Sequence, residues 1–64
     1  MKYVIFDCIS KEYFVETLGV MAVFFDPNIK EAYLFDSKRE AETYMLELLT
    51  VCVDLEELEV QEVV

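Results

Sequence analysis

Carboxylates are the side chains with most potential for chemistry in this 64-residue chain, which has fourteen Asp and Glu, five Lys and Arg, no histidine and a net charge of −9. Glu40, Glu47 and Asp54 are spaced by seven, so they share one face of a helix that extends that far. More carboxylates follow towards the C-terminus. Such an acidic surface is electrostatically complementary to a basic region of another protein. We therefore predict an acidic partner-binding face made of Glu40, Glu47, Asp54, Glu56, Glu57 and Glu59.

The same charge disfavours other partners. Affinity for nucleic acid comes largely from cations placed on phosphates, so direct binding to DNA or RNA is not expected. An anionic membrane surface is disfavoured for the same reason. The longest apolar run, Leu18 to Phe25, is shorter than the roughly 18 residues of a spanning helix. The N-terminal residues do not resemble a secretory signal. We expect a cytoplasmic protein.

Catalysis and metal binding find little support in the residue types. Asp7 could act as a general acid if it were buried, but no histidine or phosphate-binding loop accompanies it, and we expect it to be exposed at an edge or interface. The two cysteines, Cys8 and Cys52, do not resemble a disulfide framework, and we expect both to be free, buried thiols. The acidic C-terminal cluster lacks the glycine turn of a calcium loop. We predict no enzyme activity, metal or cofactor.

The element that must position these carboxylates is a helix within 35–52. Ser37 followed by Glu40 is a capping box, in which the hydroxyl accepts a first-turn amide and the carboxylate reaches back to the cap. The apolar residues then recur with the period of an amphipathic helix. This predicted helix core consists of Ala41, Tyr44, Met45, Leu48, Leu49 and Cys52.

The rest of the chain predicts a sheet beneath that helix. β-Branched and aromatic residues favour strands over 2–9, 12–17, 30–35 and 58–64, and the first should be covered on both faces because both are largely apolar. Residues 20–25 fit a strand or a helical turn. Residues 1–64 are thus predicted to be a single α+β domain, an antiparallel β-meander of four to five strands (β-β-β-β-α-β) with one amphipathic helix packed on one face.

Hydrophobic residues make up 56% of the chain, above the usual range of about 45–50%. One helix can cover only one face of the sheet, and small domains tolerate only limited apolar patches. We therefore expect another molecule to cover the helix-free face, either a different protein or a second copy in a homodimer.

The strand–helix junction, with Ala32, Phe35, Ser37, Glu40 and Ala41 in an A-x-x-F-x-S-x-x-E-A pattern, resembles that of small acidic proteins encoded by bacteriophages. The resemblance implies an accessory protein that binds and inhibits a host factor, as anti-CRISPR and other anti-defence proteins do. It assigns no functional residue.

Two functions remain open from the sequence. The first is a protein-binding inhibitor that acts as a nucleic-acid mimic by occupying a basic, nucleic-acid-binding surface of a host protein. The second is a structural homo-oligomer, assembled through the helix-free sheet face, whose acidity only maintains solubility.

Overall fold

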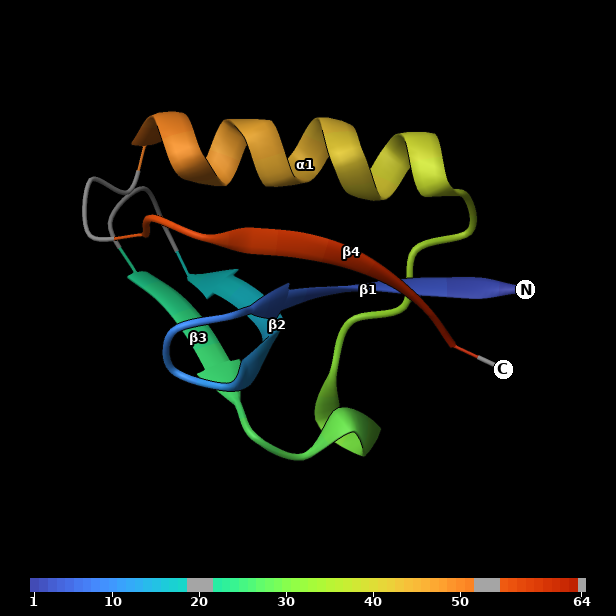
Figure 1. The fold of residues 1–64 in the computed structure, drawn as a ribbon, viewed down its shortest axis with the longest axis horizontal. Coiled ribbons are helices and arrows are strands. Elements are labelled where there is room, and N and C mark those ends of the chain that lie inside the picture. Colours follow the sequence, from blue (N-terminus) through green and yellow to red (C-terminus); the bar gives the residue numbers. More distant parts are fainter. Residues whose placement is uncertain (19–21, 52–54, 64) are drawn as a thin grey trace.

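The computed structural model describes residues 1–18, 22–51 and 55–63. Its strands form one antiparallel sheet in the order β3-β2-β1-β4, with α1 packed along one face (Figure 1). This confirms the α+β fold predicted from the sequence. The elements are β1 (Lys2–Asp7), β2 (Glu12–Leu18), β3 (Ala22–Asp26), the 3-10 helix η1 (Ile29–Glu31), α1 (Lys38–Val51) and β4 (Leu58–Val63).

β1 is a central strand because the chain returns to its free edge after the helix. β1, β2 and β3 follow one another as a meander, and β4 then pairs with β1 along its whole length, from Lys2 opposite Val63 to Asp7 opposite Leu58. The start of β1 and the end of β4 therefore lie at the same end of the sheet (Figure 1). Val4 and Ile5, neighbours on opposite faces of β1, are both fully buried, which confirms that this strand is covered on both sides.

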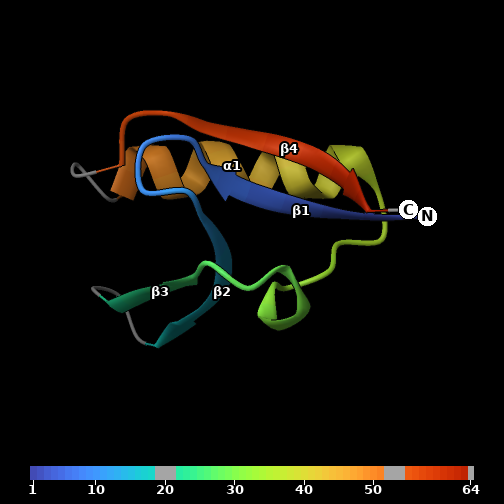
Figure 2. The same cartoon turned by 60° about the horizontal axis from the view of Figure 1, so that its bottom comes forward.

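The sheet forks where β2 leaves β1. These two strands pair only at Phe6 with Tyr13 and at Asp7 with Glu12, and Figure 2 shows β2 turning away from β1 beyond this point. The segment 33–35 connects the two strands across the fork. Tyr3 and Phe35 exchange two backbone hydrogen bonds of 3.0 and 2.8 Å, and the amide of Tyr33 donates to the carbonyl of Phe14 at 2.9 Å.

The strand predicted over residues 30–35 is wrong. The chain forms η1 instead, because the Asn28 side chain accepts a hydrogen bond from the Lys30 amide at 3.0 Å and holds the backbone in a turn. Only Phe35 keeps strand pairing, as an isolated bridge to Tyr3. The segment 20–25, left open between strand and helix, contributes β3 from Ala22 onwards; residues 20 and 21 lie outside the described part.

The expectation of an exposed Asp7 is also wrong. Its exposed fraction is 9% because β1 ends there and the side chain turns into the following loop. The carboxylate Oδ1 accepts hydrogen bonds from the amides of Ile9 and Ser10, at 2.9 and 3.3 Å. Lys11 completes this tight connection with a left-handed φ of 63°. Asp7 thus stabilises a hairpin loop, and β1 is two residues shorter than predicted.

The core lies between α1 and the sheet. Aromatic and aliphatic side chains from β1, β2, segment 33–35 and α1 meet in one cluster, and flanking residues of β3 and β4 pack against it. The apolar stripe of α1 supplies its helical part, as expected for an amphipathic helix. The buried members of the cluster are Ile5, Phe14, Phe35, Ala41 and Leu48.

Candidate functional site

A groove runs between α1 and the fork in the sheet. It consists of two adjoining cavities of about 500 and 290 Å³, which share Tyr33, Phe35 and Tyr44 in their walls. The larger cavity extends along α1 and the smaller one towards β2. We call this feature the tyrosine groove; its walls include Glu16, Tyr33, Phe35, Glu40, Tyr44 and Glu47.

Phe14 supports the groove from below. It is 2% exposed, and its ring centroid lies 5.1 Å from that of Tyr44 and 6.3 Å from those of Tyr33 and Phe35. Tilted and offset aromatic pairs at such separations are favourable beyond the area that they bury. The two tyrosine rings are therefore held by a packed aromatic base.

The first three turns of α1 place three side chains on the groove. Glu40, Tyr44 and Glu47 follow at intervals of four and three, which puts them on one face of the helix. Ser37 fixes the start of this helix, since its Oγ accepts a hydrogen bond from the Glu40 amide at 3.1 Å. This confirms the predicted cap; among the described residues, the reciprocal hydrogen bond from the Ser37 amide to the Glu40 carboxylate is not formed.

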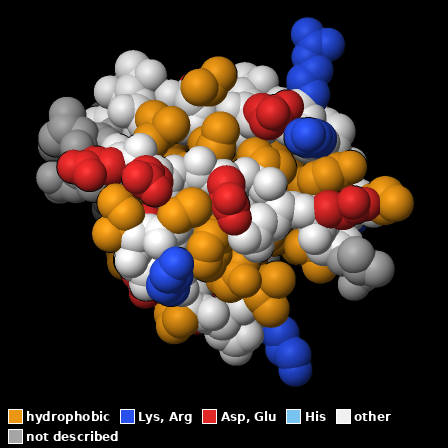
Figure 3. Space-filling model, viewed as in Figure 1, with side chains coloured by type: hydrophobic (Ala, Val, Ile, Leu, Met, Phe, Trp, Pro, Cys, Tyr) orange, Lys and Arg blue, Asp and Glu red, His pale blue; other side chains and the backbone are white. Residues whose placement is uncertain are grey.

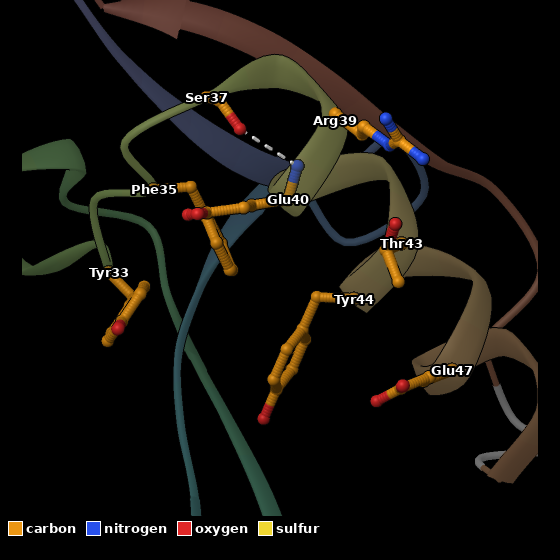
Figure 4. Close-up of a pocket in the computed structure, with 8 residues that line it drawn as sticks. All are labelled: Tyr33, Phe35, Ser37, Arg39, Glu40, Thr43, Tyr44 and Glu47. Atoms are coloured by element: carbon orange, nitrogen blue, oxygen red, sulfur yellow. Dashed lines mark hydrogen bonds between the residues drawn. The ribbon is translucent and has the colours of Figure 1, made fainter.

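Figure 4 shows how the side chains lie around the opening. Tyr33, from the segment before the helix, and Tyr44, from α1, lie on either side of an open space, and the carboxylates of Glu40 and Glu47 lie nearby. The Tyr44 hydroxyl is 3.1 Å from Oγ1 of Thr17 in β2, a hydrogen bond that links the two walls. Arg39 lines the same cavity, but its guanidinium points away from the two tyrosines.

The charge of the groove is negative. Glu16, Glu40 and Glu47 are exposed, and within the described ranges the one salt bridge joins Lys2 to Asp36. That exposed pair shifts both groups: its hydrogen bond lowers the pKa of Asp36 and raises the pKa of Lys2. Glu40 raises the pKa of Lys2 slightly further, so this cation lies near the helix start. The groove carboxylates therefore face solvent without a paired cation in the described part of the chain.

The structure divides the predicted acidic face into two groups. Glu40 and Glu47 lie on the groove, whereas Glu56 and Glu57 precede β4 and Glu59 lies within it; all five are exposed. The carbonyl of Glu57 accepts a hydrogen bond from the amide of Cys8, just beyond the end of β1. α1 instead begins near the start of β1, where Phe35 pairs with Tyr3. The two groups therefore lie near opposite ends of this strand. Asp54 lies outside the described residues. Figure 3 likewise shows acidic side chains spread over one face among hydrophobic ones.

The predicted helix core is placed largely as expected. Ala41 is fully buried and Leu48 is 4% exposed, while Tyr44 and Met45 are half-buried and pack against the core. Leu49 is half-buried as well, and Cys52 lies outside the described residues. Leu46, off the stripe, is 62% exposed. The stripe thus serves packing, with Tyr44 also forming a wall of the groove.

Cys8, the cysteine in the described part of the chain, is a free, half-buried thiol. Burial raises its pKa, and the nearby carboxylates of Glu59, Glu57 and Asp7 raise it further, against a smaller opposite effect of Lys11. The thiol is therefore a poor nucleophile near neutral pH. No group of three potential metal ligands occurs within residues 1–18, 22–51 and 55–63.

Sequence reasoning placed Tyr44 in the helix core and missed the groove itself. The available signal was the residue type: a tyrosine has a polar tip that needs water or a partner, unlike the phenylalanines beside it. The space between Tyr33 and Tyr44 depends on the divergence of β1 and β2, which no local pattern encodes.

A scan of protein-family models, a search of curated proteins and a search of solved structures each found no match to this chain. The resemblance to phage-encoded inhibitors therefore stays a prediction. Among the helices of the described part, none has the length and apolar character needed to cross a membrane.

Proposed function

We propose that this protein is a non-enzymatic, acidic protein-binding module whose partner presents a basic surface. The proposed partner is a host protein that binds nucleic acid through that surface, and the proposed setting is the cytoplasm. Occupation of the surface by carboxylates in place of phosphates would inhibit the partner. The observation that carries the proposal is the exposure of Glu40, Glu47, Glu56, Glu57 and Glu59 on a chain of net charge −9.

The electrostatics support a basic partner. Nine uncompensated negative charges on a domain of this size repel one another, and apposition of cations relieves that repulsion. Complementary potentials also accelerate encounter and exclude wrong partners. Glu40 and Glu47 are seven residues apart on α1, which separates them by about 10 Å along the axis, close to three base-pair rises of about 3.4 Å. Such spacing is compatible with phosphate sites on a nucleic-acid-binding protein.

The experiment is a pull-down from cell lysate, at low and then at high salt, followed by affinity measurement on the recovered partner. We expect affinity to fall steeply with salt, because exposed charges are screened beyond about 8 Å at physiological ionic strength. Nucleic acid should compete with this protein for the partner. A complex insensitive to both salt and nucleic acid would contradict the proposal.

Matched double variants separate the contribution of the acidic face to binding from the effect of total charge. Glu40→Gln/Glu47→Gln removes two proposed contacts, whereas Glu42→Gln/Glu62→Gln removes the same charge from two other exposed positions. We expect the first variant to weaken binding clearly more than the second. Equal effects would show that only net charge matters and that the named face is not the binding surface.

A second candidate function, assembly of identical copies through the helix-free sheet face, is favoured by the apolar residues there. Phe24 is 47% exposed and lies opposite its neighbours Val23 and Phe25, which pack against the core. Phe6 and Tyr13 pair on that face with centroids 4.9 Å apart and remain half-buried. Light scattering tests this alternative: a stable dimer at micromolar concentration that Phe24→Ser dissociates would support it, and a monomer would exclude it.

A further inference from the structure

The tyrosine groove combines two features that occur together in sites for organic cations. Aromatic faces attract a cation through their electron-rich rings, and nearby carboxylates supply charge and hydrogen-bond acceptors. Tyr33 and Tyr44 provide the accessible rings, and the buried Phe35 packs against both, centred 4.8 Å from Tyr33 and 5.6 Å from Tyr44. Glu40 and Glu47 provide the carboxylates on the same cavity.

We propose that the tyrosine groove binds the guanidinium side chain of an arginine presented by a protein partner. This inference rests on the proposed function and identifies which group of the basic partner the protein recognises. The planar guanidinium can stack on a tyrosine ring while its N–H groups donate to a carboxylate, which a compact lysine ammonium cannot do as well. The cavity of about 500 Å³ is large enough for such a side chain.

The state of the groove residues supports this occupant. Tyr33 is 54% exposed, so its ring is available to a ligand, and the hydrogen bond to Thr17 holds the ring of Tyr44 in place. The guanidinium of Arg39, the cation on the wall of this cavity, points away from the space between the tyrosines (Figure 4). Phosphates or nucleobases would meet carboxylates instead of the cations that their binding requires.

The test is a titration of isotope-labelled protein with a short arginine-containing peptide, followed by amide NMR shifts. The matched control peptide carries citrulline, which keeps the shape of arginine and removes its charge. We expect the arginine peptide to shift the amides of Tyr33, Tyr44 and Glu47, and the citrulline peptide to leave them unchanged. Equal shifts with both peptides, or shifts centred on β4, would overturn the inference.

Three single variants locate the interaction. Tyr33→Leu should weaken binding of the arginine peptide about three- to tenfold, the loss expected for one cation–π contact. Tyr33 is half-exposed and is therefore suited to replacement without unfolding. Glu47→Gln should weaken binding at least about twofold, whereas Glu42→Gln, with the same charge change on another face of α1, should not. Equal weakening by Glu47→Gln and Glu42→Gln would reduce the effect to net charge and refute a defined site.

The outcomes also distinguish this inference from the proposed function. Arginine-peptide binding in the groove without any salt-sensitive protein partner would uphold the inference and reject the proposed function. A salt-sensitive partner complex that keeps full affinity with Tyr33→Leu would uphold the proposed function and reject the arginine site.

Discussion

Replacement of Phe14 by leucine tests whether the aromatic base holds the fold and the groove together. Phe14→Leu keeps an apolar side chain at a position that is 2% exposed but removes ring contacts with Phe25, Tyr33, Phe35 and Tyr44, at centroid distances of 5.9, 6.3, 6.3 and 5.1 Å. An aromatic pair contributes about 0.5–1.5 kcal/mol beyond its buried area. Even at the lower limit, four pairs give about 2 kcal/mol.

A loss of this size is large for so small a domain. A single core in a chain of this length supplies only about 3–5 kcal/mol, so Phe14→Leu should remove around half of the free energy of unfolding. The midpoint of thermal unfolding should fall by about 8–16 °C. The assay is urea and thermal unfolding followed by far-UV circular dichroism, with the slope of the urea transition as a check that the denatured state is unchanged.

Phe24→Leu is the matched control because it makes the same chemical change at a side chain that is 47% exposed. We expect it to alter the free energy of unfolding by no more than about 0.5 kcal/mol. If the two variants are destabilised equally, Phe14 is not the centre of the core and does not hold the groove together.

Three further predictions follow from local contacts. Ser37→Ala should destabilise the fold by about 1 kcal/mol in urea unfolding, since it removes the acceptor for the Glu40 amide, while Ser37→Asp should retain stability; equal losses would exclude a capping role. Lys11→Gly should stabilise the protein by up to about 1 kcal/mol, because glycine adopts a φ of 63° without the steric cost borne by lysine, and a clear loss would contradict this. The Lys2–Asp36 pair lowers the pKa of Asp36, so its stabilising effect is present above the ordinary aspartate pKa and is lost as pH falls through the lowered value. The free energies of unfolding of the wild type and of Asp36→Asn, measured in urea, should therefore differ near neutral pH and converge in acid. A difference that persists in strong acid would refute this origin.

The elements that follow from short-range patterns were predicted correctly. The cap at Ser37 and the 3.6-residue period of the apolar stripe specify α1, and alternating or β-branched segments specify β1, β2 and β4. β3 lies in the segment 20–25, which the pattern left open between a strand and a helical turn. The segment 30–35 has comparable strand composition, yet Asn28 satisfies the Lys30 amide locally and starts a turn instead. Here the local hydrogen bond outweighs the strand propensity of residues 30–35. The sequence pattern alone does not show which of these two effects is the stronger.

The remaining features depend on contacts distant in sequence. The burial of Asp7 was missed because its carboxylate is satisfied by two loop amides, which makes an interior position acceptable for an unpaired aspartate. The groove was missed because its walls come from α1, β2 and segment 33–35, and their separation depends on where β2 leaves β1. Residue types indicated the charge of the site; only the fold places Tyr33 opposite Tyr44.

The strand order β3-β2-β1-β4 leaves the outer sides of β3 and β4 as open hydrogen-bonding edges within the described part of the chain. Open edges of this kind invite other copies to add strands, and abundant like charge is one way in which proteins oppose such growth. At the isoelectric point of about 4.1 the net charge is zero, so the electrostatic repulsion between copies is lost. Acidification towards this pH should therefore drive self-association into β-rich aggregates, so the acidity of this domain also protects it from its own sheet.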